Sequence, residues 1–492
     1  MLKRMMTGVL VMALVLGLAG IATAAPYDLD GSQTVNWTGD PAAPPDLELL
    51  DNGTPLSVSP DGEGVYIMPE AGRGLDLGAN WLRTTRGSDD PRSDILLNLN
   101  GGDLVGTGAE LPAGDYVYSR PDGNVSLSTF ISPPSSANVG SGHIDIQNVR
   151  DISTAMITTG TDGRHWGTAN LYSAGDITIG SEGNRARHIR VDSIDARVRE
   201  KGRGGAITIY SSGNVLIQDA SADPIPGEIR TGGENPGGTG DINISHHGNF
   251  VAGDIQSGSG RGPGNVSIDG NALGNDPTGT FRVANLYTYA REVSGWGGSG
   301  GTVEISGYTD VTITGNIHAY SNSTAGDHHG GDVIIGGSTG DPNVTGDITV
   351  KGNIDLSYRD DPANSGNLTL RTSGGSITLA ELDLDLLQSA WLDAGSGASW
   401  VLGGLHGFDV DNPDDGLLEA PLGQHIYYDP FYYDEGNLVL GGNPFPNAYL
   451  LGTEYTLQSG GVLAPVPVPI PEPAGLSLLG LALLGLKRKR RS

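Results

Sequence analysis

The side chains of this sequence that could do chemistry are mostly acidic. The densest group of carboxylates lies in the segment 409–416 and consists of Asp409, Asp411, Asp414 and Asp415. Calcium prefers hard oxygen ligands of this kind. Pro413 and the spacing do not match an EF-hand loop, so the alternative is an acidic loop solvated by water. We predict that no cofactor is required and that Ca²⁺ is the ion these four residues would hold.

Acidic and basic residues also suggest acid–base chemistry on a glycan. Breaking a glycosidic bond needs paired carboxylates, or a carboxylate with a basic partner, close together in space. The candidates are Asp195, Arg197 and Arg230. No recognisable motif surrounds them, and among 57 acidic residues some will align with arginine by accident. We therefore predict no enzyme activity and nominate no catalytic residue.

Histidines and threonines are the remaining candidates. The adjacent histidines at 246–247 and 328–329 lack a Glu-x-x-His spacing, which argues against a transition-metal site. Outward threonines would suit binding to ice or another crystal surface. Thr178, Thr208 and Thr369 share one position of a repeat, but other residues interrupt that set.

The composition argues against an ordinary helical or α/β enzyme. The 492 residues include 79 glycines and no cysteine, which favours many turns and excludes disulfides and thiolate chemistry. The formal net charge of −29 should repel nucleic acid and anionic membrane surfaces. No nucleic-acid partner is predicted.

One unit recurs along the middle of the chain: a glycine, any residue, then an aliphatic, a polar and an aliphatic residue. Its glycines are 24 to 37 residues apart, at Gly142, Gly175, Gly205, Gly240, Gly264, Gly301, Gly331 and Gly366. Alternation with period two predicts short strands that bury one set of side chains. A second strand follows at places such as 215–217 and 311–313, and a third at places such as 194–196 and 229–231.

Three strands and three turns in a mean spacing near 32 residues describe one coil of a parallel β-helix. Turn-forming residues such as Asn214, Asn249 and Asp310 stand nine residues after the glycine. The predicted fold class is all-β: a right-handed parallel β-helix (β-solenoid) with N- and C-terminal caps. Residues 140–400 resemble the β-helices of filamentous-haemagglutinin and autotransporter-type adhesins, in phrases such as 346–356. The resemblance implies a rod that presents side chains.

The first residues are typical of a secretory signal peptide. Lys3 and Arg4 precede an apolar stretch, and the small residues Ala22 and Ala24 flank Thr23 as a cleavage site. We predict cleavage after Ala24 and export through the inner membrane. An uncleaved membrane anchor is the alternative.

The last residues combine three ordered parts. A proline-rich stretch ends in Pro471, Glu472 and Pro473, and residues 474–486 are mostly apolar. At ~1.5 Å per residue this run is roughly 20 Å long, a short transmembrane helix and a weak anchor in a ~30 Å hydrocarbon core. The basic cluster that follows, which should stay cytoplasmic, is Lys487, Arg488, Lys489, Arg490 and Arg491.

This tail resembles the PEP-CTERM sorting signal. The resemblance implies recognition by an exosortase, removal of the tail, and delivery to the cell surface or an exopolysaccharide matrix. Before processing, the inner membrane holds the precursor by its C-terminal helix. Loss of the leader and tail would remove seven basic residues and one acidic residue, which leaves the rest near −35.

The predicted organisation has five parts. They are a signal peptide (1–24), an N-terminal cap with irregular first coils (25–140), parallel β-helix repeats (141–400), a C-terminal cap (401–464) and the sorting signal (465–492). A cluster of aromatic residues in the C-terminal cap, at 427–433, suggests sugar binding.

From these features we predict an exported structural or adhesin-like protein of the cell surface or extracellular matrix, associated with exopolysaccharide. The first alternative is a β-helix polysaccharide lyase or glycoside hydrolase. The second is a protein that binds ions or a crystal surface.

Overall fold

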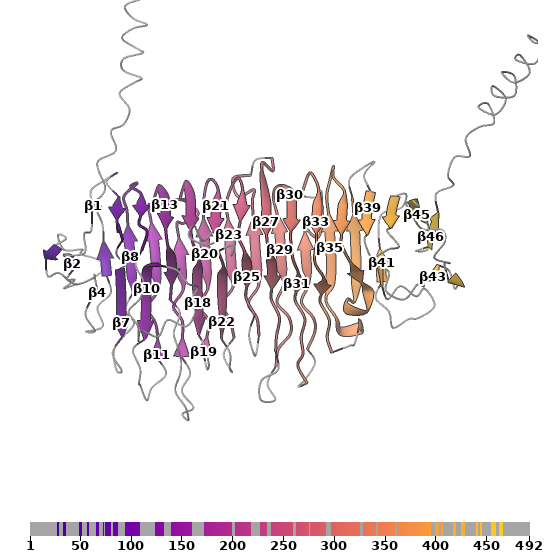
Figure 1. Ribbon diagram of the computed structural model, residues 1–492, viewed down its shortest axis with the longest axis horizontal. Coiled ribbons are helices and arrows are strands. Elements are labelled where there is room, and N and C mark those ends of the chain that lie inside the picture. The colour runs from indigo at the N-terminus through magenta and orange to yellow at the C-terminus, as the bar shows by residue number, and fades with distance from the viewer. Residues whose placement is uncertain are drawn as a thin grey trace, which may run out of the picture.

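The computed structural model describes residues 94–394 except 109–123, 132–138, 160–171, 199–201, 218–226, 234–237, 259–261, 275, 292–296, 325–327, 341–342 and 360–361. It also describes residues 72 and 74–79 and further short strands between residues 27 and 465. Within this part of the chain the protein is all-β, and its strands stack in three parallel sheets, the arrangement of a parallel β-helix (Figure 1).

Successive coils from β5 (Val65–Ile67) to β34 (Ile354–Asp355) contribute one strand to each sheet in turn, and the later coils add strands to sheets 1 and 2. Sheet 1 contains β5 (Val65–Ile67), β8 (Ile95–Asn98), β12 (Ile144–Gln147), β16 (Ile177–Ile179), β20 (Ile207–Tyr210), β23 (Ile242–Ser245), β26 (Val266–Asp269), β29 (Val303–Ser306), β32 (Val333–Ile335), β35 (Asn367–Arg371), β38 (Ser389–Asp393) and β41 (Leu417–Glu419). Sheet 2 contains β1 (Tyr27–Asp28), β6 (Leu75–Asp76), β9 (Leu104–Val105), β13 (Asp151–Thr154), β17 (His188–Val191), β21 (Val215–Ile217), β24 (Phe250–Val251), β27 (Gly279–Val283), β30 (Tyr308–Ile313), β33 (Ile348–Val350), β36 (Ile377–Leu379), β39 (Ser399–Leu402) and β42 (His425–Tyr428). Sheet 3 contains β4 (Ser57–Val58), β7 (Leu82–Arg86), β10 (Val125–Ile131), β14 (Met156–Thr158), β18 (Ile194–Val198), β22 (Ile229–Gly233), β25 (Asp254–Gln256), β28 (Asn285–Tyr287), β31 (Ile317–His318) and β34 (Ile354–Asp355).

Smaller elements lie beside these sheets and near their ends. The parallel ones are β11 (Val139–Gly140) with β15 (Tyr172–Ser173) and β19 (Gly202–Arg203), and β37 (Leu382–Asp383) with β40 (Leu405–His406). The antiparallel ones are β2 (Gln33–Val35) with β3 (Leu49–Asp51), β43 (Val439–Leu440) with β44 (Asn443–Pro444), and β45 (Glu454–Gln458) with β46 (Val462–Pro465) and with β42 of sheet 2. Two short 3₁₀ helices are η1 (Pro362–Asn364) and η2 (Leu384–Leu386).

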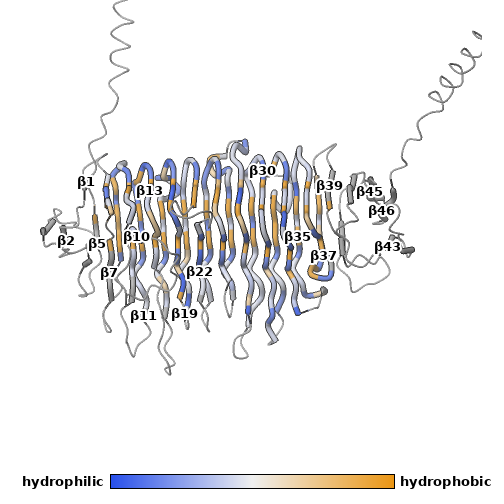
Figure 2. The backbone as a smooth tube through the Cα atoms, in the orientation of Figure 1, coloured by the Kyte–Doolittle hydropathy of each residue, from blue (hydrophilic) through white to orange (hydrophobic). Residues whose placement is uncertain are grey.

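The aliphatic pairs of the repeat form the inner face of sheet 1, as predicted. All of them are at most 2% exposed, and each pair lies in register with the pair of the next coil, as Ile207 does with Ile242. The predicted second and third strands of that coil are β21 and β22. Figure 2 shows the resulting alternation, with hydrophobic positions recurring from coil to coil. Stacking is therefore what buries the core, because a single coil has no apolar partner of its own.

The opening glycine of the repeat is required by close approach of consecutive coils. A Cβ atom built on Gly205 would lie 1.9 Å from the carbonyl oxygen of Gly175, and one on Gly366 would lie 2.0 Å from that of Gly331. No side chain fits there, so this row of glycines is a packing feature and not only a set of turns. Buried hydroxyls satisfy several of its carbonyls, as when Thr159 donates to Gly175 at 2.6 Å and Thr231 to Gly240 at 2.8 Å.

Side chains of Asn and Asp hold the turns in register. Asn214 accepts a hydrogen bond from the backbone N–H of Asn249 at 2.8 Å, and Asp310 accepts one from Asp347 at 2.9 Å. Each bond joins one coil to the next, which satisfies a turn N–H that has no strand partner. The turn formers expected from the sequence thus act between coils.

Candidate functional site

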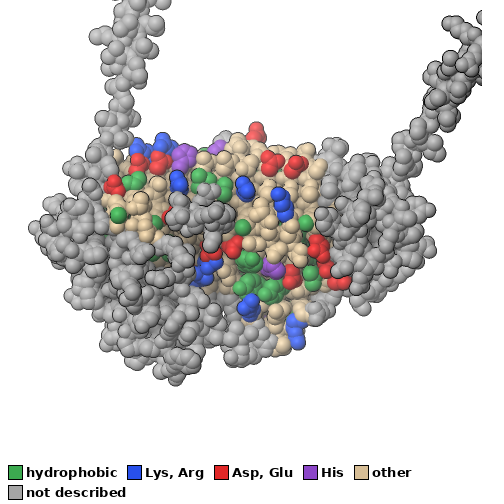
Figure 3. All heavy atoms as spheres, viewed as in Figure 1, with side chains coloured by type: hydrophobic (Ala, Val, Ile, Leu, Met, Phe, Trp, Pro, Cys, Tyr) green, Lys and Arg blue, Asp and Glu red, His purple; other side chains and the backbone are tan. Residues whose placement is uncertain are grey.

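The outer face of sheet 3 carries aromatic side chains where β28 and β31 run. Successive side chains of a strand point to opposite faces of the sheet, which explains their exposure. Leu286 and Thr288 point into the core, whereas Tyr287 and Tyr289 are half-buried on the outside. Tyr320 stands outside in the same way on the next coil. In Figure 3 a cluster of green side chains with a purple histidine and red acidic groups lies over this part of the body.

Together these residues line an open groove of about 370 Å³, which we call the tyrosine groove. Its lining residues are Tyr287, Tyr289, Arg291, His318, Tyr320, Asn322 and Asp355. Sites for small molecules usually have roughly 300–1,000 Å³. The volume is therefore that of a site for a sugar-sized group.

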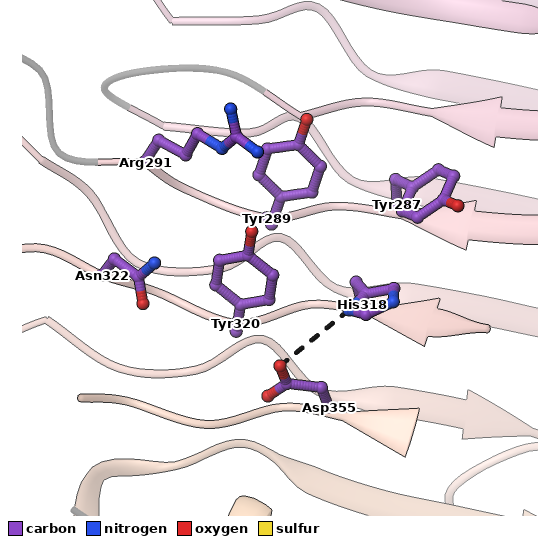
Figure 4. A pocket seen from close by; sticks show the side chains of 7 residues that line it. All are labelled: Tyr287, Tyr289, Arg291, His318, Tyr320, Asn322 and Asp355. Carbon is purple, nitrogen blue, oxygen red and sulfur yellow. Dashed lines mark ion pairs between the residues drawn. The ribbon is translucent and has the colours of Figure 1, made fainter. Parts of the chain in front are cut away.

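Tyr289 and Tyr320 form the floor of the groove. Their ring centroids are 5.3 Å apart and their planes differ by 10°, and Figure 4 shows the rings side by side on consecutive coils. A Cβ atom on Gly258 would lie 3.2–3.3 Å from three ring atoms of Tyr289, so the inner face of that ring rests on a bare stretch of the preceding coil. Gln256 donates to the Tyr289 hydroxyl at 3.3 Å from the same coil. That coil does not cover the opposite face of the ring, and the Arg291 guanidinium carbon lies over the ring, 5.3 Å from its centroid.

Tyr287 and His318 stand as a wall along one side of this floor. Their rings lie parallel to within 19° at 5.5 Å. Tyr287 meets Tyr289 at 80°, and His318 meets Tyr320 at 83°, so wall and floor are nearly perpendicular. Burial, then the nearby Asp254, raises the pKa of Tyr287, which keeps its hydroxyl protonated as a hydrogen-bond donor.

Polar groups border the groove on its other sides. The exposed Arg291 guanidinium carbon lies 5.3 Å from the centroid of the Tyr289 ring, and Asn322 follows Tyr320 at the equivalent place one coil on. Asp355 lies 3.9 Å from His318 Nδ1 (Figure 4). Burial favours the neutral acid, but His318 and the hydroxyl and N–H of Ser357 outweigh burial and lower the pKa of Asp355. The groove thus offers donors, an acceptor and an aromatic surface together.

A ladder of side-chain amides fixes the strands that carry the groove. Asn285 accepts a hydrogen bond from the N–H of Asn316 at 2.7 Å, and Asn316 accepts one from the N–H of Asn353 at 2.9 Å. Asn285 also donates to Asp254 at 2.7 Å. Each of these residues precedes the buried aliphatic residue of its strand. The ladder therefore sets the register in which the rings of successive coils meet.

A charged row adjoins the groove on the same sheet. Strand register places Asp195, Arg230, Gln256, Tyr287 and His318 side by side on successive coils. The three residues nominated for acid–base chemistry are thus neighbours. Arg197, however, donates to both carboxylate oxygens of Asp195, at 3.0 and 2.9 Å, and that carboxylate is 6% exposed. The carboxylate is held in an ion pair and is not open to a sugar above the sheet.

Glu228 and Arg230 form a second ion pair in this row. Burial is the main cause that raises the pKa of Glu228 and lowers the pKa of Arg230, although the two opposite charges oppose both shifts. Arg230 Nε is buried without a hydrogen-bond partner among the described residues. The row therefore holds charges at the edge of the groove that are largely compensated by each other.

The other nominated residues fall elsewhere. His246 is buried in the core beside Tyr308, whereas His329 is exposed. Thr178 and Thr208 are register partners on sheet 1, and Thr369 lies on a later coil next to Ile334. In the part of the chain that the structure describes, no three His, Cys, Asp or Glu side chains gather as metal ligands.

Several predictions concern residues outside the described part of the chain. They are the cleavage site at Ala22 and Ala24, the carboxylates Asp409, Asp411, Asp414 and Asp415, the motif Pro471, Glu472 and Pro473, and the basic residues 487–491. Among the residues that are described, none belongs to a helix long and apolar enough to span a membrane.

The tyrosine groove was not predicted from the sequence, which suggested sugar-binding aromatic residues in the C-terminal cap instead. A signal exists: residues 285–291 read Asn-Leu-Tyr-Thr-Tyr-Ala-Arg, and residues 316–322 read Asn-Ile-His-Ala-Tyr-Ser-Asn. The two segments share asparagine, aliphatic, aromatic and tyrosine positions and lie one coil apart.

Comparisons of the chain with protein-family models, with curated proteins and with solved structures found no match.

Proposed function

We propose that this chain is an exported structural, adhesin-like protein whose solenoid binds polysaccharide through the tyrosine groove. The observation that carries the proposal is the floor of two half-exposed tyrosine rings, 5.3 Å apart on consecutive coils, bordered by Arg291 and Asn322. A sugar ring has apolar C–H faces and polar edges. Tyrosine matches it with a large apolar face and a hydroxyl, at low cost in side-chain entropy.

The rest of the molecule suits a spacer. A strongly acidic, cysteine-free body with a charge near −35 after processing stays dispersed and resists association with other acidic surfaces. We propose that the coils are right-handed, because parallel strand connections almost always are. Caps at both ends would cover the strand edges that an open solenoid leaves unpaired.

The proposed cellular location rests on the sequences at the two ends of the chain. We propose that the leader directs export through the inner membrane, and that an exosortase recognises Pro471, Glu472 and Pro473 and removes the tail. The product would reside at the cell surface or in the extracellular matrix. Replacement of these three residues by alanine should leave full-length precursor in the inner membrane, measured by membrane fractionation and immunoblotting. Normal release of the variant would contradict this assignment.

Polysaccharide binding is tested by retention of the purified protein on the exopolysaccharide of the cells that make it. The wild type should be retained, and the variant Tyr289→Ala/Tyr320→Ala should pass through. Tyr210→Ala is the control, because Tyr210 is a half-buried tyrosine on sheet 1, away from the groove. Equal retention of all three proteins would overturn the proposal.

A polysaccharide lyase or hydrolase is the second candidate, favoured by the charged row that adjoins the groove. The same incubation should then produce new chain ends, but Arg197 holds both carboxylate oxygens of Asp195 and keeps them from a sugar above the sheet. We expect retention without new chain ends.

A further inference from the structure

The spacing of the floor indicates which polysaccharides fit. Neighbouring strands of a sheet lie about 4.8 Å apart, and the ring centroids of Tyr289 and Tyr320 follow this spacing at 5.3 Å. One pyranose unit of a fully extended chain has about the same length as this step from coil to coil. Two successive sugars can therefore rest on two successive tyrosines only if the chain runs parallel to the solenoid axis.

The orientation of the rings adds a condition on the linkage. The two ring planes differ by only 10°, so two stacked sugars must present nearly parallel faces. Pyranoses joined through equatorial bonds at positions 1 and 4 form flat, ribbon-like chains that do this. Axially linked pyranoses turn at each linkage, and their successive faces diverge.

The side chains on either side of the floor restrict where a polysaccharide chain can lie. Tyr287 and His318 rise at 80° and 83° to the floor on one side, and the exposed side chains of Arg291 and Asn322 border the other. A ribbon between them has its ring edges, with their equatorial hydroxyls, directed at hydrogen-bonding groups on both sides. A bulky helical chain would meet the wall.

We infer that the tyrosine groove selects an extended, equatorially linked polysaccharide that lies along the solenoid axis with one sugar on each coil. This inference rests on the proposed function, since it names the ligand class of the same site. It assigns Tyr289 and Tyr320 as the two sugar subsites and Gly258 as the residue that lets the first ring lie flat.

The test compares two glucose hexamers that differ in linkage geometry. Cellohexaose is equatorially linked and flat, and maltohexaose is axially linked and coiled. Isothermal titration calorimetry with the purified protein should show cellohexaose binding at least about tenfold more tightly than maltohexaose. Tyr320→Ala should weaken cellohexaose binding about tenfold or more, whereas Tyr320→Phe, which keeps the ring, should retain most of it. Circular dichroism of both variants verifies that the fold is kept.

Failure of this inference is distinguishable from failure of the proposed function. Equal binding of both hexamers, or binding of neither, together with tyrosine-dependent retention on the exopolysaccharide, would overturn the linkage rule and leave the function standing. Retention that does not depend on Tyr289 and Tyr320 would remove both. Loss of cellohexaose binding in Tyr320→Phe as well would show that the hydroxyl and not the ring makes the subsite, and would also overturn the inference.

Discussion

His246 and Tyr308 form a polar pair inside the apolar core, and we predict that acid weakens the coils around them. Both side chains are fully buried, and His246 Nε2 lies 2.5 Å from the Tyr308 hydroxyl. The His246 ring packs 5.7 Å from Phe250, and its Nδ1 has no hydrogen-bond partner among the described residues. A neutral imidazole suits this place, whereas an imidazolium would bring a poorly compensated charge into the core.

The size of the effect follows from the pKa of His246. Burial lowers this pKa from 6.5 to about 4, so the folded protein binds the proton less well than the unfolded chain does. The stabilisation is complete above pH 6.5 and is lost as the pH falls from 6.5 to about 4. Within this window the free energy of unfolding falls by about 1.4 kcal/mol for each pH unit that the pH is lowered, or by about 3 kcal/mol in total. The nearby His247 and Arg185 add positive charge that acts in the same direction.

Hydrogen exchange measured coil by coil is the appropriate assay, because a long repeat array need not unfold as one unit. The free energy of opening of β23, β24 and β30 should fall by about 3 kcal/mol between pH 7 and pH 4 in excess of that of distant coils. The variant His246→Phe/Tyr308→Phe replaces both partners by apolar rings of similar shape and should lack this excess. Equal pH dependence in wild type and variant would show that protonation of His246 does not weaken these coils.

Three further predictions concern packing and register. Gly205→Ala should destabilise the protein by about 3 kcal/mol, seen as a lower melting temperature, because its Cβ would lie 1.9 Å from a carbonyl oxygen of the preceding coil. Gly183→Ala, which meets nothing within 4 Å, should be nearly neutral, and equal effects would contradict the packing role of the glycine row. Arg197→Met should cost about 3 kcal/mol by chemical denaturation, since it leaves a carboxylate buried and unpaired, whereas the exposed Arg190→Met should cost little. Asn316→Ala should cost about 1 kcal/mol and weaken retention on polysaccharide, and unchanged retention would show that the amide ladder does not position the rings.

Much of the fold was predictable because burial follows a local pattern. Period-two alternation identifies Ile207 and Ile209 as inward residues whatever the neighbouring coils contain, and the same holds for the other aliphatic pairs. In the sequence, the glycine row only marked where each repeat begins. Its reason, the carbonyl oxygen of the previous coil, depends on a contact between residues about 30 positions apart.

The site was less predictable because it depends on register across coils of unequal length. Asp195 and Arg230 become neighbours through strand pairing, whereas the ion pair of Asp195 with Arg197 joins two residues of one strand, β18, and was not predicted. Tyr289 and Tyr320 look like two isolated tyrosines until their coils are aligned. An alignment of coils by their asparagine ladder, beginning at Asn285, would have brought them together.

Binding in the tyrosine groove is tested most directly by observing the tyrosines themselves while polysaccharide is added. Fluorine NMR of the protein with ring-fluorinated tyrosine, assigned by single Tyr→Phe variants, reports each ring separately. We predict that the signals of Tyr289 and Tyr320 shift on addition of cellohexaose while that of Tyr210 does not. Binding that shifts other tyrosines and leaves these two unchanged would contradict the assignment of the groove as the polysaccharide site.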